Sequence, residues 1–230
     1  MSDSVDPIDN DGMTLDPPGS IAVVGAGPLG IEAALYGRFL GYEVTVIEAV
    51  AIGHSMKDQH ELPLELLPGR CLSPLALSAL RAQRGDIGEQ VLPTTCGQWI
   101  DEGLKKLAET DLLRGRVWLP MRVSHIANVP IDADEGDEDA SEIPPDFRLT
   151  FVGEGDETGV IDVESVILAI GLSSEIPLGF ELPTPYFFRI AARSTGDPEQ
   201  DLISGFREIV AIFAELAGRA DLDLYRPRRR

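Results

Sequence analysis

The sequence has few of the residues that build thiol or metal sites. Only two of its 230 residues are cysteine and three are histidine, and the cysteines, Cys71 and Cys96, are 25 positions apart. They form neither a CxxC redox pair nor a zinc motif, so no metal site is expected. Two isolated thiols are typical of a protein kept in a reducing, cytoplasmic environment.

Basic residues and long apolar runs are scarce as well. Nineteen Lys and Arg against 39 Asp and Glu give a net charge of −20, which repels nucleic acid and anionic lipid. No apolar run approaches the roughly 18 residues that span a bilayer. The acidic first residues are unlike a secretory or mitochondrial leader. We therefore expect a soluble, cytoplasmic protein whose partners include neither nucleic acid nor a membrane.

The apolar content, 43% of the residues, is enough for the core of one large domain. Polar, turn-rich residues 1–19 predict a disordered arm, and residues 223–230 a basic tail. Residues 20–222 between them are expected to form one domain. Within it, residues 50–95 are an irregular excursion and residues 132–146 an acidic, solvated loop.

The hydrophobic pattern alternates between strands and helices. The continuous apolar run at residues 21–24 is typical of a parallel strand covered on both faces. A helix over residues 28–40 and a second strand at residues 43–48 are expected to follow it. The order predicts an α/β fold, a parallel sheet with helices plus a three-stranded antiparallel β-meander. The other expected elements are helices near 73–83 and 98–107, strands at 116–119, 166–170 and 186–190, meander strands at 122–129, 147–152 and 160–164, and a last helix, capped by Asp197, that ends near 216.

The connection between the first strand and the first helix has the pattern G-x-G-x-x-G. Gly25 allows the tight turn out of the strand, Gly27 lets a diphosphate approach the bare backbone, and Gly30 allows the helix to pack closely on the sheet. The start of the helix offers free N–H groups to the phosphates. The motif predicts a dinucleotide site in a Rossmann-like fold. Its residues are Gly25, Ala26, Gly27, Pro28, Leu29 and Gly30.

Glu48 closes the second strand, 18 residues after Gly30. A carboxylate there accepts hydrogen bonds from ribose hydroxyl groups and repels a 2′-phosphate, which disfavours NADP. Ala34 and Gly41 are expected to keep the helix small where it meets the sheet. A tight turn with an incidental glutamate would give the same letters, but strand, helix, second strand and acid are all in register. The motif by itself fits both FAD and NAD.

The order of elements over most of residues 20–218 resembles the FAD-binding part of the two-dinucleotide-binding-domain flavoproteins, which include thioredoxin reductase-like, pyridine nucleotide-disulfide reductase-like and flavin monooxygenase-like proteins. In that group a three-stranded meander replaces a crossover helix, and an apolar strand ending in Ala-Thr-Gly passes beside the FAD. Here the strand ends in Ala169, Ile170 and Gly171. The resemblance implies bound FAD, with Ala169 and Gly171 beside the cofactor and Val123 against the adenine.

The chain departs from this group in two places. Relatives insert a second glycine-rich domain, which binds NADPH, where this chain has only residues 172–185. Their Gly-Asp pair before the last helix is replaced by Ala191, Ala192 and Arg193, and Arg193 is a candidate for a phosphate or flavin contact. A flavin would then take its electrons from the substrate, from free NAD(P)H or from an electron-donor protein. We expect the face left by the second domain to be covered by self-association into a homo-oligomer or by another subunit.

Three functions stay open. An FAD-dependent oxidoreductase of unknown substrate is favoured, and a non-catalytic FAD- or nucleotide-binding relic or sensor would share its site. A single-domain NAD-dependent dehydrogenase would need a Tyr-x-x-x-Lys or comparable pair, and none of the four tyrosines is followed by lysine at that spacing. No catalytic residue can be named. Four polar residues of the excursion are candidates for a phosphate contact or proton transfer, with a plain solvated loop as the alternative: His54, Lys57, Asp58 and His60.

Overall fold

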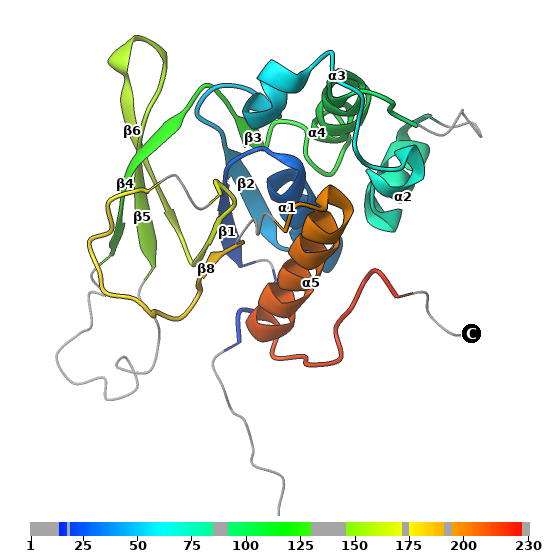
Figure 1. Ribbon diagram of the computed structural model, residues 1–230. Coiled ribbons are helices and arrows are strands. Elements are labelled where there is room, and N and C mark those ends of the chain that lie inside the picture. The colour runs from blue at the N-terminus through cyan, green and yellow to red at the C-terminus, as the bar shows by residue number, and fades with distance from the viewer. Residues whose placement is uncertain are drawn as a thin grey trace, which may run out of the picture.

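The computed structural model describes residues 14–17, 19–84, 92–129, 146–171, 175–190 and 195–226. This part of the chain forms a five-stranded parallel sheet with helices and a three-stranded antiparallel sheet (Figure 1). The elements are β1 (Ser20–Val24), α1 (Pro28–Leu40), β2 (Glu43–Ile47), η1 (His54–Gln59), η2 (Pro68–Arg70), α2 (Pro74–Arg84), α3 (Cys96–Gln98), the π-helical η3 (Trp99–Leu104), α4 (Lys105–Ala108), β3 (Val117–Trp118), β4 (Arg122–Asn128), β5 (Phe147–Val152), η5 (Glu154–Asp156), β6 (Thr158–Val163), β7 (Ser165–Leu168), β8 (Phe187–Arg189) and α5 (Pro198–Leu216).

The parallel sheet has the strand order β3-β2-β1-β7-β8. β1 is central, with β2 on one side and β7 on the other, and both pair with it in parallel. The chain therefore leaves β1 in one direction and later returns on its other side. The carboxyl end of β1 is the topological switch point, which is where open α/β sheets bind ligands. The predicted fold, a Rossmann-like parallel sheet plus a meander, is confirmed.

Helix α1 packs closely against the sheet, although not through both of the small residues expected. Ala34 is fully buried. Gly41 instead ends the helix, with a left-handed φ of 98° and its N–H bonded to the Arg38 carbonyl. The close approach is at Gly37, where an added Cβ would lie 2.9 Å from the Val44 side chain. The expectation for Gly41 was wrong because a glycine at the end of a helix serves the turn rather than the packing.

The meander β4-β5-β6 is antiparallel throughout, and Figure 1 shows it at the left of the molecule. β4 has an irregular register between Val123 and His125. The chain after β7 runs back along β4, because the Ile126 N–H donates to the Pro177 carbonyl at 3.1 Å and the Gly179 N–H donates to the Ile126 carbonyl at 2.8 Å. The end of β7 and the start of β4 thereby face the same space above β1.

Residues before position 20 and after position 222 also make contacts with the domain. Leu15 is buried, and its N–H donates to the Leu216 carbonyl at 2.8 Å. At the other end, the Leu224 N–H donates to the Tyr36 hydroxyl at 2.9 Å. A single leucine in a polar segment hardly changes the average composition of that segment, so its burial is not apparent from the sequence. Residues 1–13, 18 and 227–230 lie outside the described residues, as do residues 132–145 of the expected acidic loop.

The described residues contain neither a candidate membrane span nor a candidate metal cluster. None of their helices combines the length and the apolar character needed to cross a membrane. The same ranges hold no cluster of three or more His, Cys, Asp or Glu side chains placed to bind a metal ion.

Candidate functional site

A cavity of about 840 Å³ lies at the carboxyl end of β1. Its volume falls in the range of small-molecule and cofactor sites. Two of the ten site residues named from the sequence, Ala26 and Gly30, are buried and do not line it. The other eight line this one cavity: Gly25, Gly27, Pro28, Leu29, Glu48, Val123, Ala169 and Gly171.

Two of the motif's glycines are required by the backbone around them. Gly25 has a φ of 105°, and a Cβ added there would lie 2.7 Å from the Ala169 carbonyl oxygen. A Cβ added to Gly30 would lie 2.0 Å from the Gly25 carbonyl oxygen. Both contacts are with backbone, which cannot move aside as a side chain can. These glycines therefore hold the turn between β1 and α1 in its tight form.

Gly27 differs from its two neighbours in the motif. Its φ of −75° and ψ of −178° suit any residue, and no described atom lies within 4 Å of an added Cβ. Neither backbone strain nor packing explains a glycine here. The free space beside Gly27 is part of the cavity, which Gly27 itself lines. A group bound in the cavity could thus reach the backbone at this residue.

The N-terminus of α1 opens into the same cavity and is not capped by a side chain. Its first turn contains no acidic residue, and Pro28 has no N–H. The first N–H with an acceptor is that of Ile31, which donates to the Gly27 carbonyl at 3.0 Å. Within the described residues, no acceptor bonds the N–H groups of Leu29 and Gly30. These two donors and the positive end of the helix dipole favour an anion.

Glu48 is fixed by hydrogen bonds to both of its carboxylate oxygens. The Ala26 N–H donates to Oε2 at 2.8 Å, and the Val50 N–H donates to Oε1 at 2.9 Å. The main chain is held too, because the Met121 N–H donates to the Glu48 carbonyl at 2.7 Å. Each carboxylate oxygen keeps a lone pair for a further donor. Glu48 is thus oriented toward the cavity before any ligand arrives.

The far wall of the cavity comes from the start of β4 and from the segment after β7. Val123, named from the sequence, is almost buried and pairs with Phe151, whereas Arg122 is exposed. The sequence indicated Val123 on this wall but not the segment after β7, because irregular backbone carries no periodic pattern. The additional lining residues on this side are Met121, Arg122, Ser124, Glu175, Ile176 and Pro177.

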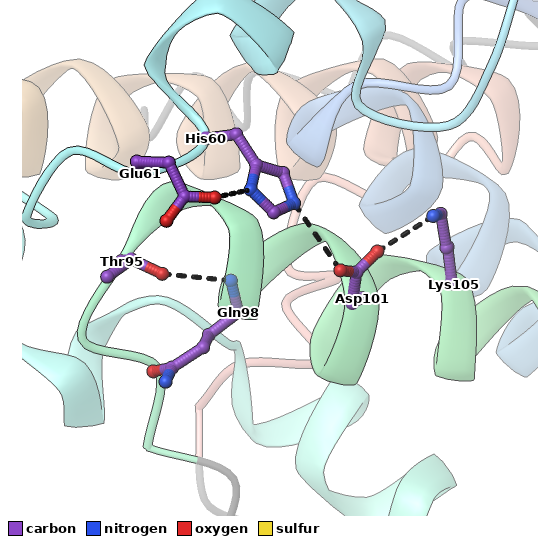
Figure 2. Close-up of polar contacts among 6 residues, drawn as sticks. All are labelled: His60, Glu61, Thr95, Gln98, Asp101 and Lys105. Atoms are coloured by element: carbon purple, nitrogen blue, oxygen red, sulfur yellow. Dashed lines mark hydrogen bonds and ion pairs between the residues drawn. The ribbon is translucent and has the colours of Figure 1, made fainter.

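Of the four polar candidates in the excursion after β2, only His54 lines the cavity; Ser55, which the sequence did not single out, lines it as well. His60 points elsewhere, and Figure 2 shows its ring directed at Asp101 of η3 and at Glu61. Lys57 and Asp58 are exposed and do not line the cavity. Arg193, the remaining candidate, lies outside the described residues.

Both cysteines are free and buried. Burial raises the pKa of the Cys71 thiol to about 11 and also raises the pKa of Cys96. A thiol is a nucleophile only when ionised. Neither cysteine is therefore poised for thiol-disulfide chemistry at neutral pH.

No protein-family model matches the sequence, nor does any curated protein. Solved structures do match. Bacillithiol disulfide reductase Bdr from Bacillus cereus has 16% identity and a TM-score of 0.46, covering 66% of this chain and 40% of that one. FAD-bound OTEMO has 19% identity and a TM-score of 0.44, covering 68% and 26%. Oxidised steroid monooxygenase bound to NADP has 18% identity and a TM-score of 0.43, covering 66% and 26%.

The chain thus spans less than half of the length of each of these solved structures. The likeness to these structures is one of fold alone. At these identities the function of this chain has to be argued from its own residues.

Proposed function

We propose that this chain is an FAD-binding flavoprotein with an oxidoreductase function, which holds the diphosphate of FAD at the start of α1 and the adenosine ribose at Glu48. The observation that carries the proposal is the free space beside Gly27. A tight turn that served compactness alone would need Gly25 and Gly30, whose neighbours are backbone, but would leave Gly27 open to any side chain. A diphosphate bound against the backbone at Gly27 would explain why this position is a glycine.

The electrostatics of the chain support a phosphate at this place. The protein as a whole carries −20, so an anion needs a local donor site to bind at all. The start of α1 has two free N–H groups and no acid in its first turn. The longer helix α5 is different, because Asp197 caps it and Glu199 and Asp201 stand in its first turn. Of these two helices, only α1 has its positive end available.

The adenosine end of the ligand would lie between Glu48 and the start of β4. The carboxylate of Glu48, already oriented by Ala26 and Val50, would accept hydrogen bonds from the ribose hydroxyl groups. Its charge would disfavour a 2′-phosphate. Val123 and Ala169 give the cavity apolar surface for the adenine ring.

When bound, the isoalloxazine ring supplies the redox chemistry. The chain would bind and orient the cofactor, and its two buried thiols would take no part. We therefore propose that electrons come from free NAD(P)H or from a donor protein. A chain that binds FAD but never exchanges electrons is the alternative, a sensor or relic with the same site.

Titration of the purified chain with FAD, followed by flavin absorbance, tests the site. Gly27→Ala puts a methyl group into the cavity and should weaken FAD binding by at least about tenfold, which corresponds to about 1.4 kcal/mol. Gly69→Ala is the matched control, since Gly69 is exposed and an added Cβ there also meets no described atom within 4 Å. An unchanged affinity in Gly27→Ala, or a wild type that takes up no FAD, would contradict the proposal.

A second measurement separates the two versions of this function. NAD(P)H added without oxygen should bleach the bound flavin if the chain is an oxidoreductase, and air should restore the colour. A flavin that stays oxidised with every donor tried would support the sensor instead.

A further inference from the structure

One wall of the cavity is built by the segment Gly53 to His60, through His54 and Ser55. Its first residue is joined to the turn before α1, because the Gly53 N–H donates to the Ala26 carbonyl at 3.0 Å. Gly53 has a φ of 70°, and a Cβ added there would lie 2.7 Å from the Ile100 side chain of η3. The segment therefore touches both the candidate phosphate loop and the helix α3-η3-α4.

The other end of the segment is held by the His60 ring. Nδ1 lies 2.9 Å from a carboxylate oxygen of Glu61, and Nε2 lies 3.4 Å from a carboxylate oxygen of Asp101 (Figure 2). An ionised carboxylate only accepts hydrogen bonds, and a neutral imidazole has a single N–H. Both contacts can be satisfied together only when His60 is an imidazolium. The geometry itself thus favours the charged ring.

Gly97 of α3 leaves the space that the His60 ring occupies. An added Cβ at Gly97 would lie 2.3 to 2.6 Å from three ring atoms of His60. The main chains are joined as well, since the Gly97 N–H donates to the His60 carbonyl at 2.9 Å. Ring and backbone of His60 therefore both dock on the start of α3, and Gly97 leaves the room for them.

The charged groups around His60 come from two elements. Glu61 follows it in the chain, and Asp101 faces it from η3. Lys105 of α4 binds the other oxygen of Asp101 at 2.7 Å and leaves one oxygen for His60. The carboxylate of Glu61, with a smaller contribution from Asp101, raises the pKa of His60 above its usual value. A raised histidine pKa means that the contact is complete at low pH and is lost as pH rises through that pKa.

We propose that His60 is a positioning residue of the nucleotide site: its imidazolium, held between Glu61 and Asp101, fastens the wall Gly53 to His60 against α3 and η3, and FAD binds more weakly once this ring loses its proton. The inference rests on the proposed function, and it adds a pH-dependent control to the same site. His60 touches neither the cavity nor the ligand and acts only through the wall that it holds.

By thermodynamic linkage, protonation of His60 and binding of FAD affect each other equally. If protonation of His60 favours FAD binding, then bound FAD must raise the pKa of His60 by the same coupling free energy. The effect is modest, because His60 is partly exposed to solvent. We expect FAD affinity to fall about threefold from pH 6 to pH 9.

The first experiment measures the FAD dissociation constant of the wild type and of His60→Gln across about pH 6 to 9. The diphosphate of FAD is a diester and does not titrate in this range. The wild type should lose affinity as pH rises, whereas His60→Gln should bind at the weaker level at every pH. His54 also lines the cavity, and any slope that it causes would persist in His60→Gln. Equal pH profiles for the two proteins would overturn the proposal.

A matched pair of helix variants adds a control. Asp101→Asn removes a carboxylate that faces His60, while Glu109→Gln removes a carboxylate that faces Lys106 at the end of the same helix. Asp101→Asn should flatten the pH profile of FAD affinity, and Glu109→Gln should leave it as in the wild type. A flattened profile in Glu109→Gln would mean that general helix electrostatics, not His60, sets the dependence.

The second readout is the titration of the histidine ring protons by NMR. The chain has three histidines, so the His60 signal is identified by its loss in His60→Gln. Its pKa should lie above the usual value, fall in Asp101→Asn and rise when FAD is added. If FAD binds and the pKa of His60 does not move, this proposal is wrong and the proposed function stands. If no FAD binds, the proposed function itself fails.

Discussion

The two sides of the cavity are held in place by different forces. On the side of the turn between β1 and α1, the constraints are steric, since added atoms at Gly25 and Gly30 would meet backbone within 2.7 Å. On the side of the segment Gly53 to His60, the constraints at His60 are exposed ionic contacts and a ring resting on Gly97. The first side cannot yield without unfolding, while the second can loosen when one proton is lost.

This difference indicates which side of the cavity should set ligand specificity and which side should respond to pH and salt. Steric contacts with backbone do not change with pH or salt, so the diphosphate subsite at the turn before α1 keeps one geometry. Exposed ion pairs are weak and screened, so the wall held by His60 is the adjustable part. Three substitutions test this division into a rigid and an adjustable side. The expected effect decreases from Gly30→Ala through Glu32→Gln to Gly97→Ala.

The largest effect is expected at Gly30. Gly30→Ala places a Cβ 2.0 Å from the Gly25 carbonyl oxygen, so β1 and α1 must separate. We expect a loss of more than about 3 kcal/mol in the free energy of unfolding, a large part of the stability of an ordinary domain. Urea unfolding followed by circular dichroism measures it. Gly27→Ala is the control and should unfold like the wild type. A Gly30→Ala protein of wild-type stability would show that the close contact with the Gly25 backbone does not constrain the turn.

The second effect is expected at Glu32, a titrating residue of α1 that does not line the cavity. Glu32, on the buried face of α1, accepts a hydrogen bond from the Tyr225 hydroxyl at 3.0 Å. Burial raises the pKa of Glu32 from 4.5 to about 7, so the folded protein prefers the neutral carboxyl. The stabilisation from this preference is complete below about pH 4.5 and is lost as pH rises through 7.

Glu32→Gln keeps an acceptor for Tyr225 and removes the buried charge. At about pH 8 this variant should be more stable than the wild type by up to about 3 kcal/mol, and the difference should vanish toward pH 4.5. Thermal unfolding across this range measures it. Glu215→Gln, an exposed glutamate on α5, is the matched control and should follow the wild type. A wild type whose stability rises between pH 4.5 and 8 relative to Glu32→Gln would contradict the argument.

The smallest effect is expected at Gly97. Gly97→Ala takes the space of the His60 ring, but this ring is the movable end of a side chain and can swing outward. We expect a loss of at most about 1 kcal/mol in the free energy of unfolding, together with a flattened pH profile of FAD affinity. Urea unfolding and the FAD titration check the two parts. A loss as large as that of Gly30→Ala would show that the His60 side is held as rigidly as the other.

The same division decides what the sequence could predict. Glycines with fixed spacing and Glu48 at a strand end are local patterns, and the structure brings eight of the ten residues so named to one cavity. The bond from Ala26 to Glu48 was not predictable, because it depends on how two loops meet. The sequence indicates His60 only as one of four polar candidates, since its partner Asp101 is 41 positions away. Long-range ionic contacts leave no periodic signal.

The fold shows the same limit at its edges. The alternation of strands and helices predicted the parallel sheet and the meander, because many residues share in each periodic pattern. At the two ends of the domain the contacts are made by single residues such as Leu15 and Leu224, which give no periodic signal. Gly37, which makes the close contact between α1 and Val44, was missed because one glycine within a helix resembles any other small residue.

The most direct test of the central claim is an amide NMR titration of the isotope-labelled chain with FAD. The largest chemical-shift changes should fall on the N–H groups of Leu29 and Gly30, the two free donors at the start of α1. Smaller changes are expected at Ala26 and Val50, whose N–H groups donate to Glu48. Shifts concentrated elsewhere, or no shifts at all with saturating FAD, would contradict the central claim.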